Sequence, residues 1–200
     1  MSIERQTASA LKWTGLAKGV GQVVSWGVTL IVLRLLAPAD YGLIAIVSVI
    51  IALLASVAEL GLGASVIQSA NLRPEELAAV SGLVVLCNIA IGVLLALCAP
   101  LFAWFYGEPR LTALIQVASL SFAFFALNTV PQALAYRDMN FKWLAMVELT
   151  GVLVSGVATL ILALFGFGVW ALLLGNQLQN LVRTALLLRQ PQPRPVFRLS

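Results

Sequence analysis

Two long stretches without a charged residue constrain this chain most. No Asp, Glu, Lys or Arg occurs between Leu77 and Gly107, and none occurs between Leu149 and Val182. A helix crosses the hydrocarbon core of a bilayer with about 20 mostly apolar residues, so each stretch is long enough to span a membrane. The second stretch is too long for one crossing, and Gly166-Phe167-Gly168 is the expected turn between two helices.

Composition extends this interpretation to the whole chain. Of the 200 residues, 61% are hydrophobic and 10% are charged, whereas a soluble domain has about 25% charged residues. So few charges cannot cover the surface of a water-soluble globule. The chain has no His, the commonest general base and metal ligand. We therefore expect an all-α, polytopic transmembrane helix bundle that is not an enzyme and needs no cofactor and no metal.

Charged residues, prolines and glycines divide the chain into six predicted spans. Pro38 and Asp40 end the first, and a break at Gly61-Leu62-Gly63 is expected to end the second. Residues 1–189 are predicted to form one transmembrane lobe, and residues 190–200, rich in Pro and Arg, a cytoplasmic linker or tail. The predicted spans cover residues 16–36, 41–62, 78–103, 111–134, 143–165 and 168–188.

Lys and Arg are distributed unevenly between the two sides of these spans. Arg34 and Arg110 fall on one side, and the other ten of the 12 Lys and Arg residues fall on the opposite side. Cytoplasmic loops carry the excess of Lys and Arg, so both termini are expected in the cytoplasm. The basic residues are scattered between apolar segments and form no stripe, which argues against a nucleic-acid partner.

Polar residues recur at helical spacing in every predicted span. In the first span, for example, Lys18, Gln22, Ser25 and Thr29 follow at intervals of three or four. Single Ser, Thr and Asn residues often serve only to join helices. A shared polar face in all six spans instead predicts a polar-lined interior. The candidate substrate-binding residues are Lys18, Gln22, Arg34, Asn128, Gln132, Asn176, Asn180 and Arg183.

Ionisable residues at membrane depth usually line a pathway, because burying a charge in lipid is costly. Arg34 is close enough to a helix end to reach the interface or to pair with Asp40, whereas Arg183 is a stronger cavity candidate. Glu59 and Glu148 either pair with nearby cations or carry a proton for ion coupling, and the sequence leaves both open. Cations outnumber acids among these candidates, which favours a cavity for an anionic group.

Four segments resemble, in order, motifs of bacterial polysaccharide flippases. They are RLLAPADYGL at residues 34–43, ELGLGASVIQ at 59–68, AYRDMNF at 135–141 and GFGVWAL at 166–172. The resemblance covers essentially the whole chain. It is to the lipopolysaccharide and exopolysaccharide exporters of the multidrug/oligosaccharidyl-lipid/polysaccharide superfamily. Members usually have twelve or more spans in two lobes, so this chain would supply the N-terminal lobe.

The resemblance implies transport of undecaprenyl-diphosphate-linked oligosaccharide, a repeat unit of O-antigen or exopolysaccharide, across the bacterial inner membrane. The implied partners are this lipid-linked oligosaccharide, membrane lipid, a second transmembrane lobe from the same gene or a second copy, and polysaccharide polymerase machinery. The candidate residues suit such a substrate, because a diphosphate needs cations and sugar hydroxyls need amides. Alternating access would rock one lobe against the other around a midplane site.

Three alternative functions fit the sequence less well. A multidrug or cation antiporter lobe of the same superfamily should present acids to its substrates, yet the first predicted span offers Lys18 and Arg34 and no carboxylate. A lipid-phosphate enzyme needs a nucleophile or metal cluster, and the closest acidic pair, Glu75-Glu76, suits a helix start better. A non-transporting truncated subunit remains an alternative, because six helices would enclose only half of the proposed path.

Overall fold

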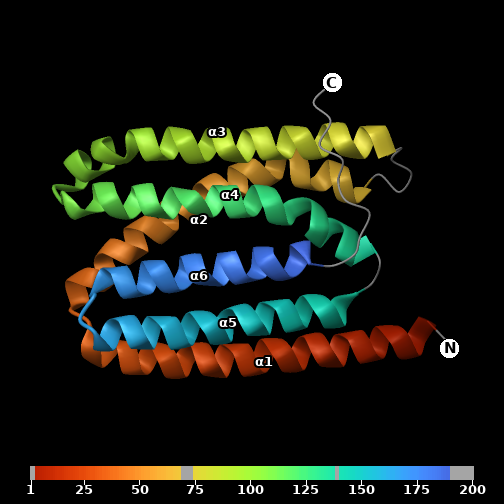
Figure 1. Ribbon diagram of the computed structural model, residues 1–200, viewed down its shortest axis with the longest axis horizontal. Coiled ribbons are helices and arrows are strands. Elements are labelled where there is room, and N and C mark those ends of the chain that lie inside the picture. Colours follow the sequence, from red (N-terminus) through yellow and green to blue (C-terminus); the bar gives the residue numbers. More distant parts are fainter. Residues whose placement is uncertain (1–2, 69–73, 138–139, 190–200) are drawn as a thin grey trace. The chain divides into compact units, whose positions relative to one another are not determined.

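The computed structural model describes residues 3–68, 74–137 and 140–189, and within these ranges the chain is helical with no strand (Figure 1). Each predicted span lies on one of the helices, so the all-α helix bundle is confirmed. The helices are α1 (Ile3–Leu35), α2 (Pro38–Gln68), α3 (Pro74–Tyr106), α4 (Arg110–Arg137), α5 (Phe141–Leu164) and α6 (Val169–Leu188). The predicted tail at residues 190–200 lies outside the described residues.

Four segments of the described residues are long and apolar enough to cross a membrane. Three other observations agree with this: the bundle is all-helical, charged residues are few, and large apolar side chains such as Leu97, Trp104 and Phe165 are exposed. In water such exposure would be costly, but in lipid it is the expected outer surface. The four segments are Pro38–Ala58, Gly82–Tyr106, Arg110–Thr129 and Phe141–Leu164.

The expected break at Gly61-Leu62-Gly63 does not end the second helix. The backbone of α2 continues as helix through these residues to Gln68. A glycine in a helix interior costs about 1 kcal/mol relative to Ala and does not forbid the helical conformation. No Pro between Gly63 and Gln68 removes a backbone hydrogen bond, so the helix continues past the two glycines. The prediction of a break was wrong.

Glycines do end α3 and α5, and at both ends they adopt a positive φ. Gly107 has φ 67° and Gly166 has φ 78°. After α5, the Gly166 N–H donates to the Ala163 carbonyl, and the Phe167 N–H donates to the Leu162 carbonyl. These two bonds form a Schellman motif, which requires the left-handed conformation that glycine adopts most easily. The predicted turn at Gly166-Phe167-Gly168 is therefore confirmed.

The chain divides into two compact units. The first spans Met1–Asp40 and Leu134–Arg189 and contains α1, α5 and α6. The second is built on Tyr41–Ala133 and contains α2, α3 and most of α4. Each unit is described by itself below.

In the first unit, α5 lies between α1 and α6 (Figure 1). Glycines allow the close approach on both sides of α5. A Cβ built at Gly156 would lie 3.0 Å from Val28 Cγ2 of α1, and one built at Gly151 would lie 3.2 Å from Gln179 Cγ of α6. Small residues at helix contacts are the usual route to tight packing in membranes, where apolar burial does not drive helices together.

In the second unit, α3 and α4 pack in the same way. Gly92 of α3 faces α4 so closely that an added Cβ would lie 3.1 Å from Phe122 Cβ and 3.2 Å from the Ser119 carbonyl oxygen. Phe122 is fully buried, and its ring contacts that of Phe125 edge-to-face with centroids 5.6 Å apart. The core of this unit is thus centred on one face of α4.

Candidate functional site

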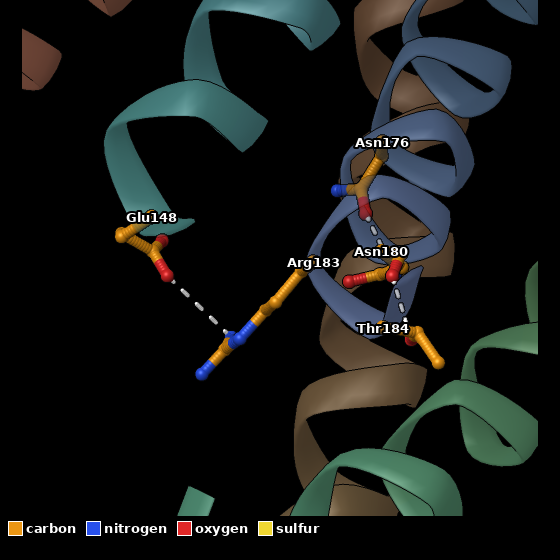
Figure 2. Close-up of polar contacts among 5 residues, drawn as sticks. All are labelled: Glu148, Asn176, Asn180, Arg183 and Thr184. Carbon is orange, nitrogen blue, oxygen red and sulfur yellow. Dashed lines mark hydrogen bonds and ion pairs between the residues drawn. The ribbon is translucent and has the colours of Figure 1, made fainter. Parts of the chain in front are cut away.

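A charged contact in the first unit joins α5 to α6. The Arg183 guanidinium Nη1 lies 3.7 Å from the Glu148 carboxylate Oε2 (Figure 2). The Arg183 side chain extends away from α6 toward Glu148, and the two side chains remain 29% and 46% exposed. Both residues were candidates from the sequence, but the sequence did not predict their pairing with each other.

A row of polar side chains runs along α6 beside this ion pair. The Asn180 Nδ2 donates to Asn176 Oδ1 at 3.4 Å, and Thr184 Oγ1 donates to the Asn180 carbonyl oxygen at 2.8 Å. With a rotation of about 100° per residue, Asn176, Asn180 and Arg183 fall within an arc of about 60° of the helix. Two amides and one guanidinium are therefore available on the same side of α6 (Figure 2).

On α1, Lys18 and Gln22 are exposed and share one face of the helix. The face turned toward α5 includes Gly21 and Val28, which helical rotation places about 60° and 80° around α1 from Lys18 on the side opposite to Gln22. Arg34 is also exposed, but helical rotation places it about 160° around α1 from Lys18. Lys18 and Gln22 can therefore contact one ligand, whereas Arg34 belongs to another side of the helix, at its C-terminal end.

The second unit contains the two α4 candidates. Asn128 is 5% exposed, and its Oδ1 is buried with no hydrogen-bond partner in the described part of the chain. Gln132 is partly buried. The equally buried Asn88 on α3 donates from Nδ2 to the Val84 carbonyl at 2.9 Å within its own helix. Asn128 thus retains an unused acceptor, whose desolvation costs about 1–3 kcal/mol, whereas the amide of Asn88 donates locally.

Glu59, the other candidate for ion coupling, lies on α2, and its side chain is outside the described part of the structure. Because the two units are described separately, the α4 candidates form one set and those of α1, α5 and α6 form another.

One contact of the first unit was missed by the sequence analysis. A Cβ built at Gly168 would lie 3.2 Å from the Asp40 carboxylate Oδ2. Gly168 is the N-cap of α6 and has no side chain to cap it, so Asp40 brings a negative charge to the positive end of the helix dipole. The segments 34–43 and 166–172, singled out by resemblance, therefore meet here. The role of Asp40 at the start of α6 is visible only in the structure, because the two segments are far apart in the sequence.

These side chains are suited to binding a ligand through hydrogen bonds and charge. A guanidinium binds phosphate through short, often paired hydrogen bonds, and Asn and Gln amides both donate to and accept from hydroxyls. Among the residues whose side chains are described, no group of three or more His, Cys, Asp and Glu residues is placed to hold a metal ion.

Comparison with known proteins identifies the family. Residues 31–200 match the family described as polysaccharide biosynthesis protein. The chain is 27% identical over 188 residues to the lipopolysaccharide biosynthesis protein WzxC of Escherichia coli, covering 93% of this chain and 38% of that protein. It is 32% identical over 177 residues to the succinoglycan biosynthesis transport protein ExoT of Rhizobium meliloti, covering 85% of this chain and 35% of that protein.

A third relative is an uncharacterized membrane protein of the cps region of Klebsiella pneumoniae, 25% identical over 191 residues, with coverage of 94% of this chain and 39% of that protein. No solved structure matches the chain. The chain thus spans 35% to 39% of the length of these relatives. The family match and the apolar helices together show that the chain belongs to the polysaccharide biosynthesis protein family and is a multi-pass membrane protein.

Proposed function

We propose that this chain forms one lobe of a transporter that moves an undecaprenyl-diphosphate-linked oligosaccharide across the bacterial inner membrane by alternating access. The observation that carries the proposal is the placement of Arg183 beside Asn176 and Asn180 on α6 of a membrane protein whose relative ExoT is a succinoglycan biosynthesis transport protein. A cation and amides on one helix face suit a ligand that carries both a diphosphate and sugars.

Different residues would serve the two parts of the ligand. Arg183 and Lys18 would attract the diphosphate, because both are cationic and neither is fully buried in the first unit. Asn176, Asn180 and Gln22 in the first unit, with Asn128 and Gln132 in the second, would hydrogen-bond sugar hydroxyls. Asn128 supports this assignment most directly, since its buried Oδ1 is an acceptor without a partner in the described chain.

The membrane arrangement is part of the proposal. All six helices would cross the bilayer with both termini in the cytoplasm, as the distribution of Lys and Arg favours. A second transmembrane lobe, from the same gene or a second copy, would complete the path and provide the opposing surface for alternating access. A second lobe agrees with the length of the relatives, since the chain covers 35% to 39% of them.

The test is genetic. In the bacterium that encodes this protein, the gene is deleted and replaced by the full-length wild-type gene or by Arg183→Gln, Lys18→Gln or Arg110→Gln versions. Losing a hydrogen bond to a charged group costs about 1.5–3 kcal/mol, so we expect Arg183→Gln to lower surface polysaccharide by about ten-fold or more at an unchanged protein level. Lys18→Gln should have a smaller effect.

Arg110→Gln is the matched control, since Arg110 forms an ion pair with Glu108 at 3.4 Å in the turn between α3 and α4 and lies outside the proposed site. It should leave surface polysaccharide at the wild-type level. Normal polysaccharide in both the Arg183→Gln and Lys18→Gln strains would contradict the cationic site.

A further inference from the structure

The Glu148–Arg183 pair suggests how the proposed site can release its ligand. We propose that Glu148 is the resident counter-ion of Arg183: an anionic phosphate headgroup displaces Glu148 when it binds, and Glu148 recovers Arg183 when the headgroup leaves. The inference rests on the proposed function and adds to it a positioning role for Glu148, which controls how strongly Arg183 holds an anion.

The geometry of the pair fits an exchangeable contact. A well-formed hydrogen bond between a guanidinium and a carboxylate is about 2.7–2.9 Å long, whereas Nη1 of Arg183 and Oε2 of Glu148 are 3.7 Å apart. Both side chains also remain partly exposed, at 29% and 46%. A phosphate oxygen that forms the shorter, paired hydrogen bonds preferred by guanidinium can therefore replace the carboxylate.

The helices on which the two residues lie are held in place close to the pair. Gly151, one turn after Glu148 on α5, faces Gln179, one turn before Arg183 on α6, and an added Cβ there would lie 3.2 Å from Gln179 Cγ. The helix backbones are therefore fixed at this level. Arg183 can change partner by rotating its long side chain alone, without a rearrangement of α5 against α6.

A transporter needs an exchangeable contact of this kind because its site must both bind its ligand and release it. A guanidinium for which no carboxylate competes would hold a diphosphate strongly. Glu148 reduces this effect, since its carboxylate contacts Arg183 in the empty protein and competes with the anion in the occupied one. Removal of the carboxylate should therefore strengthen anion binding.

This expectation separates the inference from two other roles of Glu148. If Glu148 bound the sugar, its loss would weaken ligand binding. If its charge merely repelled the ligand from a distance, Glu148→Asp would bind like the wild type, because the charge is retained. If Glu148 competes through contact, Glu148→Asp should also strengthen binding, because its carboxylate is one methylene shorter and so contacts a guanidinium already 3.7 Å away less closely.

The experiment measures the binding of farnesyl diphosphate, a short polyprenyl diphosphate, to the full-length protein in lipid nanodiscs by titration calorimetry, with empty nanodiscs as the background. The proteins are the wild type, Glu148→Gln, Glu148→Asp and Arg183→Gln. The control is Glu108→Gln, which removes a carboxylate from the Glu108–Arg110 pair in the α3–α4 turn. We expect Glu148→Gln to lower Kd about two- to five-fold, the range of a partly exposed ion pair.

Glu148→Asp should lower Kd in the same direction by a smaller factor, Arg183→Gln should raise it, and Glu108→Gln should leave it unchanged. A Kd for Glu148→Gln equal to or above that of the wild type would overturn the inference, as would wild-type affinity in Glu148→Asp. In either case the diphosphate site itself stands if the wild type binds and Arg183→Gln weakens binding. Absence of binding to the wild type would instead contradict the proposed function.

Discussion

At the scale of single residues, glycine positions determine how closely the helices of the first unit approach. Gly175 of α6 is the extreme case, because an added Cβ would overlap the Thr159 hydroxyl oxygen of α5 and lie 3.3 Å from the Ser155 carbonyl oxygen. Thr159 is itself 6% exposed. There is no space at this crossing for even one methyl group without a shift of Thr159 or of the helix.

Gly175→Ala should therefore destabilise the protein, by about 1–3 kcal/mol as is usual for overpacking. The measurement is the thermal unfolding midpoint of the full-length protein in detergent, followed by size-exclusion chromatography after heating. Gly27→Ala is the matched control, since a Cβ added to this helical glycine has no atom within 4 Å; its midpoint should be unchanged or slightly higher.

A second substitution tests whether the loss of stability comes from the contact with Thr159. Thr159→Ala removes the hydroxyl that the new methyl group would meet, so the double variant Gly175→Ala/Thr159→Ala should recover part of the lost stability. A Gly175→Ala midpoint equal to the wild type, or no recovery in the double variant, would show that α5 and α6 are not packed this closely.

The residue scale also shows how far the sequence can predict the site. Arg183, Asn176 and Asn180 could be singled out because polar side chains at helical spacing are expensive in lipid, and the structure places them on one side of α6. The partners could not be singled out. Whether Glu148 meets Arg183, or Asp40 meets the start of α6, depends on how helices far apart in the sequence are packed.

At the scale of helices, α6 departs from an ordinary membrane span. Like α1, it is not among the four helical segments of the described residues that are apolar and long enough to cross a membrane by composition, because four amides lie in its middle and Arg183 follows them. A helix of this kind is stable in a bilayer when its polar side faces a cavity or other helices. The contact of Arg183 with Glu148 gives this side one such neighbour, α5.

We expect α6 to cross the membrane nonetheless. Alkaline phosphatase, which is active only in the periplasm, should be active when fused after Phe167 in the α5–α6 turn and inactive when fused after Leu188 at the end of α6. A fusion after Gly107 in the α3–α4 turn serves as the control and should be active, because both turns are expected on the periplasmic side. Activity of the fusion after Leu188 would mean that α6 does not cross.

The helices were more predictable than their ends. Uncharged stretches indicated where helices lie, because the bilayer accepts a long apolar segment only as a helix or as part of a barrel. The turn at Gly166-Phe167-Gly168 was predicted from its glycines, and in the structure Gly107 and Gly166 each complete a Schellman motif. Gly61 and Gly63 carry the same residue type, yet α2 continues past them. Glycine alone permits a helix end and does not enforce one.

At the scale of the whole molecule, the chain provides two compact helical units and a set of polar groups in each. Since it spans 35% to 39% of the length of its relatives, the proposed pathway requires a second lobe. In that arrangement the exposed polar face of α1 and the polar side of α6 would contribute to the pathway. The proposed transport activity would therefore be tested on the full-length protein.

The most direct test of the proposed transport is translocation in purified liposomes. The full-length protein is reconstituted with the lipid-linked repeat unit extracted from the same bacterium, and an external glycosidase digests the glycan that reaches the outer leaflet. With the wild-type protein, we expect digestion of nearly the whole pool, whereas liposomes without protein should stop at about half, and Arg183→Gln should be much slower than the wild type. Digestion with the wild-type protein that stops at the protein-free level would contradict the transport of a lipid-linked oligosaccharide.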